Sequence, residues 1–272
     1  MNQAEKALKF QQLHERPGAF VLANAWDTGS ARLLAHSGFE AIATTSAGFA
    51  FSTGVGDRVP DRDSVLANAA EIVRATSLPV SADLKNAFGT TPRAVAETIT
   101  LAGAAGLVGG SIEDVSYDPN APLLPLEHAQ DLVRAAVDAA NAQPFPFLLT
   151  ARAENYLVGR PDLADVIRRL QAYQEAGAHV LYAPGVALEQ DIRTLVQSVD
   201  RPVNVVIGQS GAALTVAQLS AAGVKRVSLG SALSRRAYGA LLHAAQEIRE
   251  HGTFTFVQEA APFAVLEAIF TR

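Results

Sequence analysis

One pattern repeats along nearly the whole chain: short apolar runs typical of buried parallel strands alternate with longer amphipathic runs typical of helices. The strand-like runs number eight: Phe20–Ala25, Ala41–Ser46, Pro79–Leu84, Gly106–Asp114, Phe147–Glu154, His179–Pro184, Pro202–Gly208 and Arg226–Ser231. Eight strand–helix units within 272 residues are typical of a closed parallel barrel. No linker rich in Pro, Gly or Ser interrupts them. We therefore predict an α/β chain that forms one (β/α)8 TIM-type barrel domain over residues 1–272.

Composition excludes several classes of function. The formal net charge of −5 gives no reason to expect nucleic acid or an anionic membrane as a partner. The absence of cysteine excludes disulfides, thiolate nucleophiles and cysteine-ligated zinc. Residues 1–12 are polar and charged, and no run approaches a membrane-spanning length. We expect a cytoplasmic protein with no nucleic-acid or membrane partner.

Two connections are longer than a simple strand-to-helix turn requires. Phe49–Arg62 holds two glycines and a proline, and Val115–Leu126 holds three prolines. Long loops in compact domains often carry function, so we predict both as active-site loops and the second as a lid.

The segment Glu259–Phe270 is more hydrophobic than a lone surface helix should be. We expect residues of about 255–272 to pack on a partner subunit.

Acidic side chains lie at the ends of two neighbouring strand runs, Asp83 on one and Glu113-Asp114 on the next. Catalytic residues of such barrels gather at the carboxyl ends of the strands, which lie about 5 Å apart. Asp83 and Glu113 could therefore share Mg²⁺, which prefers oxygen ligands. Side chains alternate along a strand, so only one of Glu113 and Asp114 can point inward. The alternatives are that Asp83 caps a helix and that the acidic pair belongs to a salt-bridged rim.

Arg152 lies between alanines in a core strand and must find an anion there. Its partner is either a ligand carboxylate or phosphate, or Glu113 of the neighbouring strand. Asp57 is either a further acid of the site or a solvated loop residue. The turn Gly208-Gln-Ser-Gly211 is either an anion-binding turn or an ordinary one.

Five motifs occur in an order that resembles the isocitrate lyase/phosphoenolpyruvate mutase superfamily: Asn24-Ala-Trp-Asp27, Thr44-Thr-Ser-Ala-Gly48, Ser81-Ala-Asp83-Leu-x-Asn-x-Phe-Gly89, Ser111-Ile-Glu113-Asp114 and Thr150-Ala-Arg152-Ala-Glu154. The resemblance implies a (β/α)8 barrel whose C-terminal helix is exchanged between subunits of a homodimer or homotetramer. It implies Mg²⁺, with Mn²⁺ as an alternative, held near Asp83 and Glu113, and a small 2-oxo acid or dicarboxylate as ligand. It favours Glu113 over Asp114 as the inward-pointing acid.

The same resemblance implies roles for individual residues. The implied catalytic residues are Asp57, Asp83, Glu113 and Arg152. The implied substrate-binding residues are Ser46, Ala47, Gly48, Asp83, Lys85, Arg152 and Asn204, and the amides of Ala47 and Gly48 are expected to hold a substrate carboxylate.

Three departures from the family pattern narrow the reaction. Lys85 stands where the family has a second acid, and it could bind a second substrate carboxylate instead. The lyases carry a Lys-Lys-Cys-Gly-His loop, whereas the corresponding segment here is Tyr117-Asp-Pro-Asn120. The mutases have a lysine in the lid and a histidine after strand six, whereas this chain has Ala183-Pro184 there and no lysine between Lys85 and Lys225. These differences argue against isocitrate and 2-methylisocitrate cleavage and against phosphoryl transfer.

We therefore predict a Mg²⁺-dependent lyase or decarboxylase acting on a small 2-oxo or 2-hydroxy dicarboxylate, such as oxaloacetate or 2-oxoglutarate, through a metal-stabilised enolate. One alternative is a phosphonopyruvate-type mutase or hydrolase that acts on a P–C bond. Another is a protein that binds 2-oxo acids without turnover. The last is an aldolase that forms a Schiff base on Lys85, because Lys225 is expected at the opposite end of strand eight.

Overall fold

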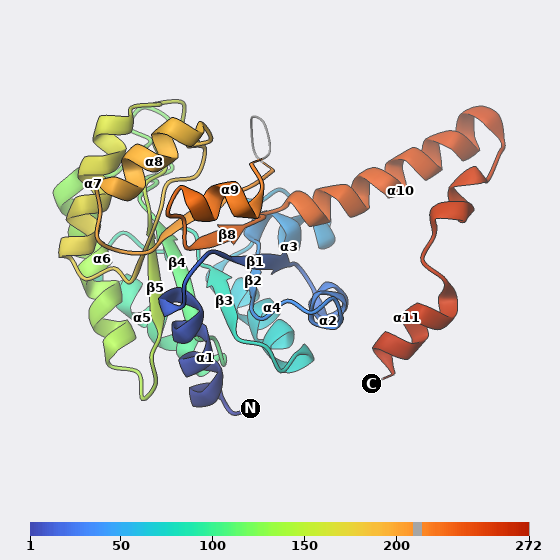
Figure 1. Cartoon of the computed structure of the whole chain (residues 1–272), viewed down its shortest axis with the longest axis horizontal. Helices are drawn as coiled ribbons and strands as arrows, with labels where there is room; N and C mark the ends of the chain where they lie inside the picture. The colour runs from blue at the N-terminus through green and yellow to red at the C-terminus, as the bar shows by residue number, and fades with distance from the viewer. Residues whose placement is uncertain (209–213, 272) are drawn as a thin grey trace.

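The computed structural model describes residues 1–208 and 214–271, and in it eight parallel strands close into a barrel in sequence order (Figure 1). The strands are β1 Phe20–Ala25, β2 Ile42–Thr44, β3 Val80–Asp83, β4 Gly109–Glu113, β5 Leu148–Arg152, β6 Val180–Tyr182, β7 Val203–Val206 and β8 Arg226–Ser228. The barrel closes where β8 pairs with β1, with Phe20 opposite Arg226. The predicted (β/α)8 barrel is confirmed.

Helices connect the strands and surround the barrel (Figure 1). They are α1 Gln3–Glu15, α2 Thr28–His36, α3 Ser46–Ser52, α4 Arg62–Ala75, α5 Pro92–Ala104, α6 Leu126–Asn141, α7 Leu163–Glu175, α8 Glu189–Gln197, α9 Val216–Ala221, α10 Ala232–His251 and α11 Phe263–Phe270, with a 3₁₀ helix η1 at Thr255–Glu259. None of these described helices is both long enough and apolar enough to cross a membrane.

The predicted loop Phe49–Arg62 is wrong in its first part, because α3 occupies Ser46–Ser52. The same helix shortens the second predicted strand, which ends at Thr44 and not at Ser46. Thr45 starts α3 because its hydroxyl accepts the N–H of Gly48, an N-cap bond that the sequence reading overlooked. The two glycines come only after this helix, so the loop proper covers residues 53–61.

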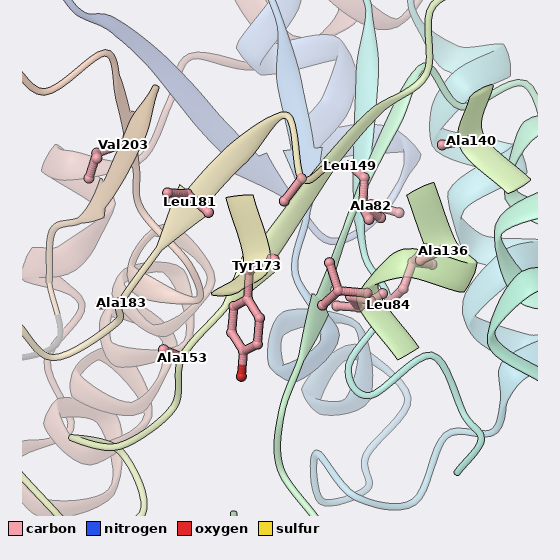
Figure 2. Close-up of a cluster of buried hydrophobic side chains, with 14 of the residues drawn as sticks. Ala82, Leu84, Ala136, Ala140, Leu149, Ala153, Tyr173, Leu181, Ala183 and Val203 are labelled. Carbon is pink, nitrogen blue, oxygen red and sulfur yellow. The ribbon is translucent and has the colours of Figure 1, made fainter. Parts of the chain in front are cut away.

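Strand residues alternate between a helix-facing layer and the barrel interior. Ala82, Leu149, Leu181 and Val203 are buried in the large apolar core (Figure 2). Their neighbours in sequence that face inward are small and polar, namely Ser81, Thr150 and Asn204. Barrel interiors are usually filled by Val, Ile and Leu. Small polar side chains in their place leave room for a cavity inside this barrel.

Helix α1 covers the amino-terminal end of the barrel. Its Ala7, Phe10 and Leu13 pack with Phe20 and Leu22 of β1 in a second apolar cluster. This helix closes one end of the barrel, so a ligand can enter only from the carboxyl ends of the strands.

The C-terminal part of the chain leaves the barrel. Helix α10 projects outward and the chain then turns back through η1 to α11 (Figure 1). Of α10 only Ser234 is buried, and none of the α11 residues is. The side chain of Phe263 at the start of α11 is 81% exposed. This C-terminal arm, residues 252–271, thus presents apolar side chains that nothing in the described chain covers.

Candidate active site at the carboxyl end of the barrel

A cavity of about 320 Å³ opens at the carboxyl ends of the strands and continues into the barrel. Its mouth includes Asp57, Arg58 and Tyr117 from the loops, and its deeper walls include Ser81 and Arg226. Ionisable side chains from β3, β4, β5 and β8 therefore share one space.

Arg152, the last residue of β5, is the centre of the charged cluster. Its Nη1 lies 2.9 Å from Asp83 Oδ1, its Nη2 lies 3.1 Å from Glu113 Oε2, and its Nε lies 2.7 Å from Glu154 Oε1. The guanidinium also lies 5.2 Å from the centre of the Tyr182 ring. The pairing with Glu113, left open from the sequence, is present together with two further carboxylates. Three of the five N–H donors are used, so two can still face a ligand.

The two acids at the end of β4 point in opposite directions. Glu113 lines the cavity, and its Oε1 accepts the Tyr117 hydroxyl at 3.0 Å. Asp114 is buried on the other side, where it accepts Arg169 Nη1 at 3.0 Å and the Tyr173 hydroxyl at 2.6 Å. The alternation of side chains thus assigns Glu113 to the site and Asp114 to the packing between β4 and α7.

Burial dominates the protonation of the acids around Arg152. Desolvation raises the pKa of Glu113, although Arg152 opposes that shift. Desolvation likewise raises the pKa of Glu154 to about 8, again against Arg152. Burial disfavours the charge of Arg152 itself, but Glu154, Glu113 and Asp83 together raise its pKa. Burial therefore favours the protonated forms of Glu113 and Glu154, whereas the charge of Arg152 favours their ionised forms.

Glu154→Gln is expected to remove a pH dependence of folding stability. The unfolded carboxyl loses its proton near pH 4.5, whereas the folded one keeps it to about pH 8. The contribution of Glu154 to stability is therefore complete below pH 4.5 and is lost as pH rises to 8. We expect the variant to gain stability over the wild type by up to about 1.4 kcal/mol per pH unit in that window. Urea unfolding at pH 5 and pH 8 measures this, with the exposed Glu127→Gln as control. Parallel pH profiles for wild type and Glu154→Gln would contradict it.

Lys85 is already engaged by the loop after α3. Its Nζ donates to the carbonyl oxygen of Asp57 and lies 3.9 Å from Asp57 Oδ1. The Lys85 backbone has a φ of 51°, in the left-handed region that residues other than glycine rarely adopt. The side chain thus ties the 53–61 loop to the end of β3, and both Lys85 and Asp57 line the cavity.

The predicted carboxylate-binding segment is only partly available. Ser46 and Ala47 line the cavity, and the Ser46 N–H lies 3.3 Å from Asp83 Oδ2. Gly48 does not line it, because its N–H donates to Thr45. A Cβ on Gly48 would lie 2.9 Å from the Cβ of Trp26, so this glycine permits close packing. The structure thus leaves Gly48 outside the site.

Asn204 lines the cavity, but both ends of its amide have protein partners. Its Nδ2 donates to Ser228 Oγ at 2.9 Å and its Oδ1 accepts Arg226 Nε at 2.8 Å.

The turn Gly208–Gly211 lies largely outside the described residues. Lys225 lies at the amino-terminal end of the barrel, where its Nζ donates to the Gly18 carbonyl oxygen.

The cavity residues to which sequence reasoning gave no role include Asn24, Glu154, Tyr182 and Arg226. The side chain of Asn24 joins two strand ends, donating to Thr44 O and accepting the N–H groups of Leu229 and Gly230. For Arg226 a signal was present. It is a lone arginine in a core strand, and the argument that singled out Arg152 applies to it equally.

The donor set of the site suits a hard divalent cation that keeps most of its water. Asp83 and Glu113 each offer a carboxylate, but each gives one oxygen to Arg152. In the described part of the chain, no three His, Cys, Asp or Glu side chains group as a complete metal cage. Mg²⁺ is commonly bound by one or two carboxylates plus water and substrate oxygens. The residues fit Mg²⁺ held in that way.

Comparison with known proteins agrees with the barrel and its motifs. The model of the phosphoenolpyruvate phosphomutase family matches residues 10–249. A crystal structure described as that of a candidate lyase/mutase from Burkholderia cenocepacia J2315 is 54% identical and superposes with a TM-score of 0.98, covering 99% of this chain and 98% of that one.

Two curated relatives have stated activities. The 2-methylisocitrate lyase of Escherichia coli K12 is 30% identical over 233 residues, which are 82% of this chain and 77% of the enzyme. The oxaloacetate decarboxylase of Chromohalobacter salexigens is 26% identical over 230 residues, which are 82% of this chain and 78% of the enzyme.

Proposed function

The chain belongs to the phosphoenolpyruvate phosphomutase family of the isocitrate lyase/phosphoenolpyruvate mutase superfamily, and on that premise we propose that this carbon–carbon lyase cleaves a small 2-oxo or 2-hydroxy dicarboxylate of the oxaloacetate type. The observation that carries the proposal is the cluster of Arg152 with Asp83 and Glu113 at the mouth of a cavity of small-molecule size. The oxaloacetate decarboxylase among its relatives supports the substrate class.

The simplest reaction is decarboxylation of oxaloacetate. The C3–C4 bond breaks, C4 leaves as carbon dioxide, and the electron pair moves onto the C2 carbonyl to give an enolate. A proton then adds at C3 to give pyruvate. The barrier is lowered by positive charge placed where the enolate oxygen develops.

The residues of the site have different roles in this reaction. Arg152 has two N–H donors left for the 2-oxo and carboxylate oxygens of the substrate, and its three carboxylate partners fix its orientation. Ser46 and Ala47 lie beside Asp83 on the cavity wall, where the start of α3 favours a substrate carboxylate. Lys85 holds the loop that carries Asp57 against the mouth. Tyr117 comes from the segment predicted as a lid, and its hydroxyl donates to Glu113 Oε1, a contact that supports a role for this segment at the site.

Mg²⁺ held by Asp83 and Glu113 through water would supply the positive charge that stabilises the enolate. Mn²⁺, which also takes oxygen ligands, would serve in the same place.

Calorimetric titration tests the function directly. Oxalate, oxaloacetate and 2-oxoglutarate are titrated with and without Mg²⁺, and pyruvate is measured in the oxaloacetate experiment. We expect Mg²⁺-dependent binding with release of pyruvate. Binding without any product would support a protein that only binds 2-oxo acids. Turnover of phosphonopyruvate in place of oxaloacetate would support P–C bond chemistry.

We also propose that the C-terminal arm packs on a partner subunit in a homodimer or homotetramer. The support is the exposure of its apolar side chains, which in an isolated chain would face water. A groove lined by Leu33 and Leu34 of α2 and by Leu233 of α10 offers an apolar surface of the same chain for the exchanged arm.

Phe263→Asp is expected to shift the protein from an oligomer to a monomer, because a charge at the centre of an apolar interface is strongly disfavoured. Size-exclusion chromatography with light scattering measures the mass. The control is Leu188→Asp, since Leu188 is 70% exposed on the barrel itself. An unchanged mass for Phe263→Asp would exclude the arm from the interface.

A further inference from the structure

Arg226 is a buried cation for which the described residues supply no counter-ion. It is the first residue of β8, it is 4% exposed, and it lines the deep end of the cavity. Across residues 1–208 and 214–271 it takes part in no ion pair, whereas Arg152 in the same cavity has three. The undescribed segment 209–213 contains no acidic residue. Burial of an unpaired charge is strongly disfavoured, so an anion is expected to complete this arrangement.

The guanidinium is oriented by neutral groups and keeps donors free. Its Nε donates to Asn204 Oδ1 at 2.8 Å, its Nη2 donates to Thr150 Oγ1 at 2.9 Å, and its Nη1 lies 3.5 Å from His14 Nε2. An arginine has five N–H donors. The three contacts leave one N–H on each Nη that can donate to a carboxylate.

His14 does not supply the missing charge. Its Nδ1 lies 2.8 Å from the Phe10 carbonyl oxygen, so Nδ1 carries the proton and Nε2 is the acceptor that faces Arg226. Burial and the neighbouring Arg226 lower the pKa of His14 to about 3, so the ring is neutral at physiological pH. Burial also lowers the pKa of Arg226 to about 10, which still leaves it charged.

The depth of Arg226 matches the length of a small dicarboxylate. Thr150, which its Nη2 contacts, comes two residues before Arg152 on β5 and therefore lies about 6–7 Å deeper in the barrel. A chain of four or five carbons with bonds of about 1.5 Å bridges such a span with its terminal oxygens. Between the two arginines the cavity wall carries the hydroxyls of Ser81, Ser111 and Ser228.

We propose that Arg226 binds the distal carboxylate of a 2-oxo dicarboxylate inside the barrel, while the 2-oxo acid end lies at Arg152. In oxaloacetate that carboxylate is C4, which Arg226 holds until the C3–C4 bond breaks and carbon dioxide leaves. Asn204 is then a positioning residue, because it holds Nε of Arg226 and is itself held by Ser228. This assignment rests on the proposed action on a 2-oxo dicarboxylate, and it makes Arg226 the residue that selects dicarboxylates over monocarboxylates.

The test compares 2-oxoglutarate with 2-oxopentanoate, which has the same carbon chain without the distal carboxylate. Calorimetry with Mg²⁺ present gives both affinities for the wild type and for Arg226→Gln. We expect the wild type to prefer 2-oxoglutarate by roughly 10- to 100-fold, and Arg226→Gln to lose that preference. Oxalate, which is too short to reach Arg226, should bind both proteins equally. Arg226→Lys should restore part of the preference.

The outcomes separate this assignment from the proposed function. An equal preference for 2-oxoglutarate in wild type and Arg226→Gln, with oxalate still bound, would overturn the assignment and leave the function standing. If the protein bound succinate through Arg226 but bound no 2-oxo acid, the proposed function would be overturned and the assignment of Arg226 as a carboxylate-binding residue would stand. Failure of the wild type to bind any of these acids would overturn both.

A measurement on the unmodified protein covers the case in which Arg226 variants do not fold. The imidazole of His14, next to Arg226, is followed by nuclear magnetic resonance during titration with 2-oxoglutarate. We expect its signals to shift, while those of His179, which binds the Leu149 N–H at the amino-terminal end of the barrel, stay in place. No shift of His14 at saturation would place the distal carboxylate elsewhere.

Discussion

Arg152→Met is expected to lower the free energy of unfolding by about 3–5 kcal/mol at neutral pH, because it leaves buried carboxyl groups without the cation that pairs with them in the described residues. Asp83, Glu113 and Glu154 all converge on this guanidinium. The loss should shrink as pH falls, since protonated carboxyls need no counter-ion and burial already raises the pKa of Glu154 to about 8. The variant should also lose affinity for 2-oxo acids, because the remaining N–H donors of Arg152 disappear with it.

Urea unfolding at pH 7 and pH 4.5 measures the first effect, and calorimetry measures the second. Arg134→Met is the matched control, because Arg134 pairs with Asp131 on the exposed face of α6 at 2.8 Å. Exposed pairs contribute about 0–1 kcal/mol, so this control should be nearly neutral. A variant as stable as Arg134→Met at neutral pH would show that the acids around Arg152 do not depend on its charge.

Asp83→Asn is expected to lower kcat/KM by roughly 100- to 1000-fold, the size of effect seen when one stabilising group of a transition state is removed. The amide keeps the shape of the side chain, but its single oxygen can accept the N–H of either Ser46 or Arg152, not both. It loses the negative charge that would hold Mg²⁺ in place. We therefore expect Mg²⁺ to stop improving the binding of oxalate to this variant.

Turnover of oxaloacetate at several Mg²⁺ concentrations measures this effect, with thermal unfolding as the check on folding. Asp131→Asn is the control, since Asp131 lies on the exposed face of α6 and away from the cavity. Mg²⁺-dependent binding that survives in Asp83→Asn would remove Asp83 from the metal site and leave Glu113 as its main ligand.

Much of the fold could be predicted because its signals are local. Helices α2 and α5, for example, begin at local caps, because the side chains of Asp27 and Thr91 accept the N–H groups of residues three positions on. Helix α3 was missed because its single cap, Thr45, follows directly on a strand and was taken as part of it. Short helices after strands leave little sequence for a periodic pattern to be recognised.

Only some of the site residues could be predicted, because the others are positioned by contacts with residues distant in the sequence. Strand ends fix which residues reach the mouth, so Asp83, Glu113 and Arg152 could be expected together. The contacts of Lys85 could not, because they depend on a loop 28 residues earlier in the chain that folds over the end of β3. Gly48 was expected to bind substrate, yet the packing of α3 against Trp26 decides its position.

The sequence by itself determined the barrel, its register of inward and outward residues and the identity of the charged strand ends, because periodicity and alternation are properties of neighbouring residues. Only the tertiary structure decided which acidic side chains pair with which arginines. It brought three acids to Arg152 and, among residues 1–208 and 214–271, none to Arg226, although each arginine lies in a core strand. The reason is that closure of the barrel sets which strands are neighbours and how deep each residue lies, and electrostatic pairing follows distance in space and not separation in sequence.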